Sequence, residues 1–259
     1  MPGRLLVDEP AEGIVRLTIS NPAKRNALDH PILDALAAAA REHAEARCLI
    51  LTGAEGMFSA GYDIGDIPED VFAERAERLV AHPFTAALDA LEACDAPVVA
   101  ALPGHTIGGG LELALCCDFR VAAEGIRLGM PPAKLGLVYS HTGVRRFIAS
   151  IGAPRTRELF LLGRNVDAQT ALAWGLVNRV AADVEAAGVE LAQELAANAP
   201  LSVRGNKRIV RELLAADVAL DADVERELIA LREASFASED MREGVRAFAE
   251  KRAARWQGR

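Results

Sequence analysis

Long apolar runs and clusters of basic residues are both absent from this chain of 259 residues. No window approaches the ~18 uninterrupted apolar residues that indicate a membrane-spanning helix, and residues 1–13 lack the apolar stretch of a signal peptide. Acidic residues outnumber basic ones by 37 to 29, which gives a formal net charge of −8. We therefore expect no membrane partner and no nucleic-acid partner, because binding to nucleic acid depends on neutralising phosphates.

Cysteine is scarce and forms no CxxC motif. The four cysteines are Cys48, Cys94, Cys116 and Cys117, and the last two are adjacent in an apolar segment. This usage argues against a disulfide framework or a cysteine-rich zinc site, so we expect buried, reduced thiols and a cytoplasmic protein. The GxGxxG, Walker, GxSxG and HExxH signatures are missing as well, so dinucleotide binding, nucleotide hydrolysis, an α/β-hydrolase triad and a histidine metal site have no support.

What the chain does have is a hydrophobic fraction of 51% and a regular alternation of strand and helix signals. Residues 14–19 alternate apolar and polar side chains, and residues 48–52 and 97–102 are short apolar runs typical of buried parallel strands. Pro31 suits the first turn of a helix capped by Asp29 or His30. Further helices are predicted at 83–94 and 111–117, and further strands at 118–122 and 126–128.

Beyond residue 141 the strand signals nearly vanish. Helical spacing predicts helices near 143–162, 167–174, 183–198, 201–215, 222–236 and 239–254. Ser238 is a plausible N-cap of the last one. The sequence therefore predicts an α/β core of about 140 residues, followed by helices too few to form an independent domain.

Two loops carry the strongest chemical signal. One is the segment 58–64 (FSAGYDI), directly after a buried strand, and the other is the segment 104–110 (GHTIGGG), between a strand and a helix. Consecutive glycines expose backbone N–H groups, and two such loops can together form an oxyanion hole for a thioester or carbonyl oxygen. The alternative is that the glycines only allow helix and strand to pack closely.

Glu112 stands in an apolar helix, one turn after Gly109. A carboxylate is costly to bury in such surroundings. It is therefore either an acid or base with a raised pKa beside the two loops, or the partner of a basic residue.

These segments together resemble the enoyl-CoA hydratase/isomerase (crotonase) superfamily. The matching motifs are NPAKRNAL, ILTGAEGMFSAGYDI, GHTIGGGLELALCCDFRVA, PPAKLG, WGLVNRV and EGVRAFAEKR, and they extend over about residues 12–255. The resemblance implies an α/β fold in which a spiral of ββα units over residues 1–198 precedes a helical trimerisation region over residues 199–259, within one continuous domain. It also implies a homotrimer or a dimer of trimers.

The resemblance further implies an acyl-CoA substrate and no separate cofactor, because coenzyme A is part of the substrate. The enolate would be held by the backbone N–H groups of Tyr62 and Gly109, and Glu112 matches the first of two glutamates that the family's hydratases use. The residues implied to contact coenzyme A are Lys24, Arg25, Ala60, Asp63, Ile64 and, from a neighbouring subunit, Phe248 and Lys251.

The chain departs from the hydratase pattern at Pro132, where the second glutamate would fall. Tyr139 and His141 follow, and this stretch is similar to the methylmalonyl-CoA decarboxylase branch. We expect decarboxylation of a 2-carboxyacyl-CoA, with Tyr139 orienting the departing carboxylate. The alternatives are enoyl-CoA hydration, double-bond isomerisation by Glu112 and His141, or a catalytically weak acyl-CoA-binding protein; Tyr139 would otherwise be a rim residue and His141 a helix cap.

Overall fold

The computed structural model describes residues 2–63, 78, 80–216 and 222–257. Its centre is a six-stranded sheet in the order β1-β2-β3-β4-β6-β9, in which β1 is antiparallel to β2 and the other neighbours are parallel. The bounds of these strands are Arg4–Ala11, Ile14–Ser20, Cys48–Gly53, Val98–Leu102, Phe119–Ala123 and Arg179–Ala181.

A second, three-stranded sheet has the order β5-β7-β8. Its strands are Thr106–Ile107, Arg127–Gly129 and Asn165–Asp167, of which β5 and β7 are parallel and β7 and β8 are antiparallel. The short strand β5 forms within the glycine-rich segment 104–110. This segment is therefore held by sheet hydrogen bonds immediately before helix α4 (Gly109–Leu115) begins.

Helix α1 (His30–Glu42) confirms the predicted start signal. Asp29 caps it by accepting a hydrogen bond from the backbone N–H of Ile32, and Pro31 lies in the first turn. The apolar side chains of the helix, which include Ile32, Leu33 and Leu36, are buried in the main core. Helix α3 (Thr85–Ala93) lies beside it, preceded by a π-helical turn (Val80–Phe84) that contains Pro83, so the regular helix begins later than predicted.

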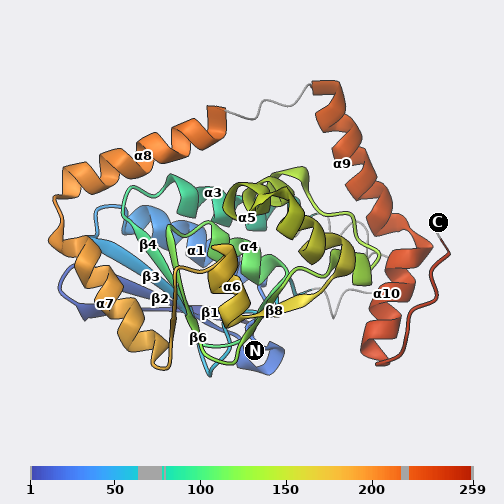
Figure 1. The fold of residues 1–259 in the computed structure, drawn as a ribbon, viewed down its shortest axis with the longest axis horizontal. Coiled ribbons are helices and arrows are strands. Elements are labelled where there is room, and N and C mark those ends of the chain that lie inside the picture. Colours follow the sequence, from blue (N-terminus) through green and yellow to red (C-terminus); the bar gives the residue numbers. More distant parts are fainter. Residues whose placement is uncertain (1, 64–77, 79, 217–221, 258–259) are drawn as a thin grey trace.

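The central sheet separates two apolar layers (Figure 1). In β3, Leu49 and Leu51 face the main core under α1, α3 and α4 (Gly109–Leu115), whereas Cys48 and Ile50 face helix α7 (Val184–Ala197). This alternation is what a strand buried on both faces requires.

The remaining helices wrap around this framework. They are α5 (His141–Leu162), α6 (Ala168–Trp174), α8 (Pro200–Ala216), α9 (Ala222–Ala237) and α10 (Glu239–Ala249). Gly152 interrupts α5 with φ 75°, and Ser238 caps α10 as predicted. Figure 1 shows α8 at one end of the molecule and α9 with α10 at the other. None of the helices in the described ranges combines the length and the apolar character of a membrane span.

The sequence prediction missed strands β1, β5, β8 and β9. Strand β1 forms in a segment without a clear strand signal, and β8 and β9 lie beyond residue 141. Because β9 pairs with β6, and α7 covers the sheet, the α/β core extends well past the expected 140 residues. The polar stretch after Gly61, for which the spacing also favours a helix, falls largely outside the described residues.

Candidate functional site

The two glycine-containing loops meet at the ends of neighbouring strands. The N–H of Ile107 donates to the carbonyl oxygen of Ser59 at 3.0 Å, and Ser59 forms a bridge with Thr106. A Cβ atom at Gly61, where φ is 98°, would lie 3.2 Å from the backbone nitrogen of Gly109. Only glycine combines this backbone conformation with so close an approach.

Tyr62 and Gly109 therefore lie side by side. Tyr62 forms a parallel bridge with Leu28, which uses the neighbouring N–H of Asp63 and the carbonyl oxygen of Gly61. Within the described part of the chain, the backbone N–H groups of Tyr62 and Gly109 donate to no protein acceptor. Two such N–H groups next to each other are the arrangement that can stabilise an oxyanion.

Glu112 lies one turn into α4, with 1% of its surface exposed. Both of its carboxylate oxygens have partners. The Tyr139 hydroxyl donates to Oε2 at 2.5 Å, and Nη1 of Arg146 donates to Oε1 at 2.9 Å. Glu112 is thus an ion-paired carboxylate, one of the two roles that the sequence left open.

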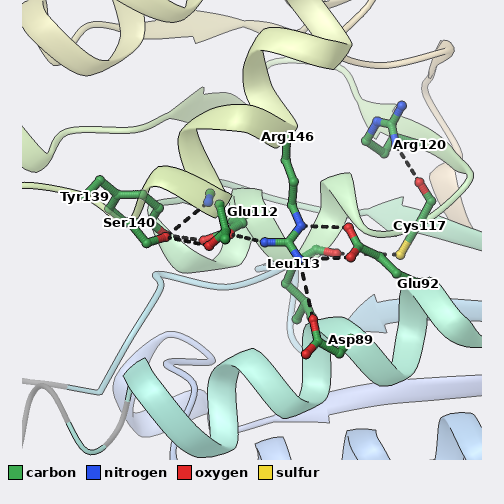
Figure 2. A network of polar contacts seen from close by, with 11 residues as sticks. Asp89, Glu92, Glu112, Leu113, Cys117, Arg120, Tyr139, Ser140 and Arg146 are labelled. Carbon is green, nitrogen blue, oxygen red and sulfur yellow. Dashed lines mark hydrogen bonds and ion pairs between the residues drawn. The ribbon is translucent and has the colours of Figure 1, made fainter. Parts of the chain in front are cut away.

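Arg146 joins Glu112 to helix α3 (Figure 2). Its Nε and Nη2 atoms donate to the two carboxylate oxygens of Glu92 at 2.7 and 2.9 Å. Asp89, one turn earlier on α3, lies 3.8 Å from Arg146. Such a bidentate pair fixes the guanidinium in both position and orientation.

The site shifts the pKa values of its acidic groups. Burial raises the pKa of Glu112, although the charge of Arg146 and the hydrogen bond from Tyr139 oppose this shift. Burial would also raise the pKa of Glu92, but the hydrogen bonds and the charge of Arg146, with smaller contributions from Cys116 and Arg145, together outweigh burial and lower the pKa. The pKa values of Tyr62 and Tyr139 rise well above the ordinary value, first because of burial and then because of the nearby Glu112 charge.

Tyr139 lies in the loop before α5, within reach of both Glu112 and Tyr62. Its hydroxyl oxygen is 2.9 Å from that of Tyr62. Ser140 caps α5 by accepting from the N–H of Gly143, where a Cβ atom would lie 2.6 Å from the Tyr139 ring and 2.8 Å from Glu112 Oε1. Gly143 thus lets the helix start close to both side chains.

Aromatic and apolar side chains enclose the two tyrosines. The ring of Tyr62 meets Phe84 edge to face, with centroids 4.6 Å apart, and the ring of Tyr139 meets Phe160 in the same way at 5.6 Å. Phe236 of α9 and Met241 of α10 are buried in a small cluster that also includes Tyr62. The C-terminal helices therefore form part of the wall of the site.

The residues predicted to contact coenzyme A are only partly brought together. Nζ of Lys24 lies 2.7 Å from the carboxylate of Asp63, and the N–H of Ala60 donates to the carbonyl oxygen of Arg25. Lys24, Arg25, Ala60 and Asp63 thus share one region next to Tyr62, whereas Ile64 lies outside the described residues.

Three further sequence candidates lie apart from the Glu112 network. His141 is the first residue of α5, and its Nε2 atom lies 3.2 Å from Glu225 of α9. The interpretation of His141 as a helix cap was wrong, since Ser140 has that role. Phe248 is 73% exposed on α10, and Lys251 follows that helix with φ 54°.

Pro132 is buried in a short 3-10 turn (Pro132–Lys134), so the position of the expected second glutamate holds no acid or base. The described residues also contain no group of three or more His, Cys, Asp or Glu side chains that could hold a metal ion. Among these residues, Glu112 is the carboxylate that lies at the junction of the two loops.

Sequence reasoning missed Arg146 and Glu92. Arg146 lies 34 positions after Glu112 and 54 after Glu92, so no local spacing connects the three. The usable signal was the buried carboxylate itself, because such a group requires a cationic partner.

Comparison with known proteins identifies the family of the chain. The sequence model described as enoyl-CoA hydratase/isomerase matches residues 9–259. Carnitinyl-CoA dehydratase of Salmonella typhi is 37% identical over 258 residues, which cover 95% of each chain.

Two solved structures extend the comparison to the fold. A methylmalonyl-CoA decarboxylase in complex with 2-nitronate-propionyl-CoA is 26% identical, with a TM-score of 0.88 over 99% of each chain. An enoyl-CoA hydratase/isomerase from Pseudoalteromonas atlantica T6c is 29% identical, with a TM-score of 0.81 over 98% of this chain and 99% of that one. The chain therefore belongs to the enoyl-CoA hydratase/isomerase family and has the crotonase fold.

Proposed function

We propose that this protein acts on an acyl-CoA thioester and stabilises its enolate with the backbone N–H groups of Tyr62 and Gly109. Support comes from the position of these two groups side by side and from the solved relatives that contain coenzyme A derivatives. The thioester oxygen, which becomes negatively charged in the enolate, would accept a hydrogen bond from each of these two N–H groups.

The reaction that we propose is decarboxylation of a 2-carboxyacyl-CoA. The main observation in support is that both carboxylate oxygens of Glu112 already accept hydrogen bonds, from Tyr139 and Arg146. In addition, Pro132 stands at the position of a second glutamate. Hydration requires carboxylates that position and activate a water molecule. Decarboxylation requires only that the bond to the carboxyl group breaks and that its electron pair enters the thioester enolate.

The tyrosine pair would orient the departing carboxylate. Tyr62 and Tyr139 together carry two hydroxyl protons, and Glu112 accepts one of them. The other lies between the two tyrosine hydroxyls, and we propose that it turns from Tyr139 to a substrate carboxylate bound beside Gly109. Proton delivery to the resulting enolate completes the product.

The neighbouring basic residues would bind the nucleotide end of coenzyme A. Lys24 and Arg25 are the candidates, and the ion pair of Lys24 with Asp63 would exchange partners when a phosphate arrives. This also accounts for the binding of a phosphate-rich ligand by a chain with a net charge of −8.

Hydration or dehydration is the second candidate, because carnitinyl-CoA dehydratase is 37% identical and burial raises the pKa of Glu112. Isomerisation by Glu112 and His141 is less supported, since His141 contacts Glu225. The remaining alternative is not an enzymatic function: a catalytically weak protein that binds acyl-CoA.

One experiment separates these functions. The purified protein is incubated with methylmalonyl-CoA, crotonyl-CoA and a 3-enoyl-CoA, and the products are followed by mass. Loss of carbon dioxide from methylmalonyl-CoA supports the proposal, whereas addition of water to crotonyl-CoA alone would replace it with hydration. No turnover of any thioester would favour the binding protein.

We also propose that the chain forms a trimer or a dimer of trimers. The apolar side chains exposed on α8 support this, and they are Leu201, Ile209, Val210, Leu213 and Leu214. Phe248 and Lys251 would then reach coenzyme A in a neighbouring subunit.

A further inference from the structure

Glu112 is the most deeply buried member of a chain of polar groups that begins at Glu92. Side-chain exposure falls from 35% at Glu92 to 13% at Arg146 and 1% at Glu112. The guanidinium of Arg146 donates three hydrogen bonds to the two carboxylates, two to Glu92 and one to Glu112. A cation held in this way from both sides cannot turn away from Glu112 without breaking the pair with Glu92.

The bonding capacity of each group then fixes the direction of the whole chain. A guanidinium only donates hydrogen bonds, so Oε1 of Glu112 must accept. Oε2 of the ionised carboxylate also accepts, so the single hydroxyl proton of Tyr139 is used in the hydrogen bond to this oxygen. The 2.9 Å contact between the two tyrosine hydroxyls must therefore be a donation from Tyr62 to Tyr139.

We propose that Arg146 is a positioning residue that keeps Glu112 ionised and thereby directs the hydroxyl proton of Tyr139 toward Glu112. Without the cation, a carboxyl group with 1% exposure would take up a proton more readily, since burial disfavours its charged form. A neutral Glu112 would donate to Tyr139, and the order of protons along the two tyrosines would reverse. The Tyr62 hydroxyl, next to Gly109, is thus the end of the chain that faces the acyl group.

Other charged groups face this pair and act on it more weakly. Asp89 lies 3.8 Å from Arg146, and the negative charge of Glu92 opposes the ionisation of Glu112. Arg232 of α9 acts on Tyr62, and Arg145 acts on Glu92. The titratable and charged groups around the network of Glu112, Arg146 and the two tyrosines thus come from α3, the C-cap of α4, α5, α9, the segment 58–64 and the loop before α5. They are Asp89, Glu92, Cys116, Arg145, Arg146, Arg232, Tyr62 and Tyr139.

The role of this chain in turnover rests on the proposed function, but its test does not need a substrate. The carbonyl stretch of protonated Glu112 is followed by infrared spectroscopy as a function of pH. The band is identified by its absence in Glu112→Gln. The variant is Arg146→Met, and the matched control is Arg157→Met, an exposed position on the same helix.

We expect the Glu112 titration midpoint to move upward by at least about one pH unit in Arg146→Met and to stay unchanged in Arg157→Met. Arg146→Lys should give a smaller upward shift, because a lysine cannot bond Glu112 and Glu92 with the same fork geometry.

A folded Arg146→Met protein that titrates like the wild type would overturn the proposal. If Arg146→Met does not fold, Arg146→Lys takes its place in the test. A Glu112 midpoint in Arg146→Lys equal to that of the wild type would then overturn the proposal. Failure of the proposed decarboxylation would leave the infrared midpoints unaffected, so the two ideas fail separately.

Discussion

The ring of Tyr62 lies directly against the backbone of Gly109. A Cβ atom at Gly109 would be 2.8 Å from Cε1 of Tyr62 and 3.0 Å from its Cζ atom. Any side chain at position 109 must therefore displace the ring whose own backbone N–H lies next to that of Gly109. The two proposed oxyanion donors are thus mechanically coupled through this contact.

Gly109→Ala should lower turnover by about 10²–10³, the usual loss when one oxyanion donor is removed. The cause is displacement of Tyr62, because alanine keeps the N–H at position 109. Steady-state kinetics with the best thioester of the panel measure the effect. Gly205→Ala on α8 is the control, since a Cβ atom there has no neighbour within 4 Å. Equal rates for the two variants would contradict the coupling.

Tyr139→Phe and Glu112→Gln should differ in their effects if the reaction is a decarboxylation. Removing the Tyr139 hydroxyl breaks its hydrogen bond to the charged Glu112 and leaves the Tyr62 hydroxyl without its partner, so loss of carbon dioxide should slow by about 10- to 100-fold. Glu112→Gln keeps the shape and should cost less than about tenfold. Rates of carbon dioxide release test both variants.

The opposite pattern identifies proton transfer as the main task of the site. In a hydration or an isomerisation, Glu112→Gln should cost about 10²–10⁴ and Tyr139→Phe should be nearly silent. Full activity of both variants would show that neither side chain carries the chemistry.

The Glu92–Arg146 pair should make the stability of the folded protein depend on pH in the acidic range. The pKa of Glu92 is lowered in the folded state, so its contribution is present above its unfolded pKa and is lost as pH falls through the folded pKa. Between about pH 5 and about pH 3, the urea midpoint of the wild type should fall more than that of Glu92→Gln. Parallel curves for the two proteins would show that the pair contributes no acid dependence.

All four cysteine thiols should be unreactive in the native protein. Each is free and buried, and burial raises the pKa values of Cys48 and Cys117 to about 12. Because the thiolate is the reactive form, a thiol reagent should label none of the four before unfolding and all of them after it. Fast labelling of the native protein at any cysteine would contradict this burial.

Self-association should depend on the apolar face of α8. Sedimentation of the wild type should give a trimer or a hexamer, and Leu213→Asp should shift it to smaller species, because Leu213 is 65% exposed in the single chain. Asn206→Asp is the control on a polar position of the same helix. A stable, active monomer of the wild type would end this interpretation.

Local signals predicted the first half of the fold well. The period of residues 14–19, the apolar run at residues 48–52 and the capping residue Asp29 all act over a few positions, and each is confirmed. Strand β9 was missed because three residues carry little periodicity, and their strand form comes from pairing with β6, more than 50 positions away.

In the site, too, local features could be predicted from the sequence and contacts between distant residues could not. The approach of the two loops follows from glycine positions that are visible in the sequence, and Tyr139 was identified as a candidate. The partners of Glu112 could not be read in full, because Arg146 is one of several arginines on α5 and only the packing of α5 on α4 and α3 distinguishes it.

The contact between α10 and the loop before Tyr139 is made by two glycines. A Cβ atom at Gly244 would lie 2.5 Å from the carbonyl oxygen of Leu135, and one at Gly136 would lie 2.7 Å from the backbone of Asp240. The last helix thus serves as a template against which the loop takes its shape. A fusion or deletion that lifts this helix would therefore distort the loop before Tyr139 and lower turnover, so purification tags belong at the N-terminus.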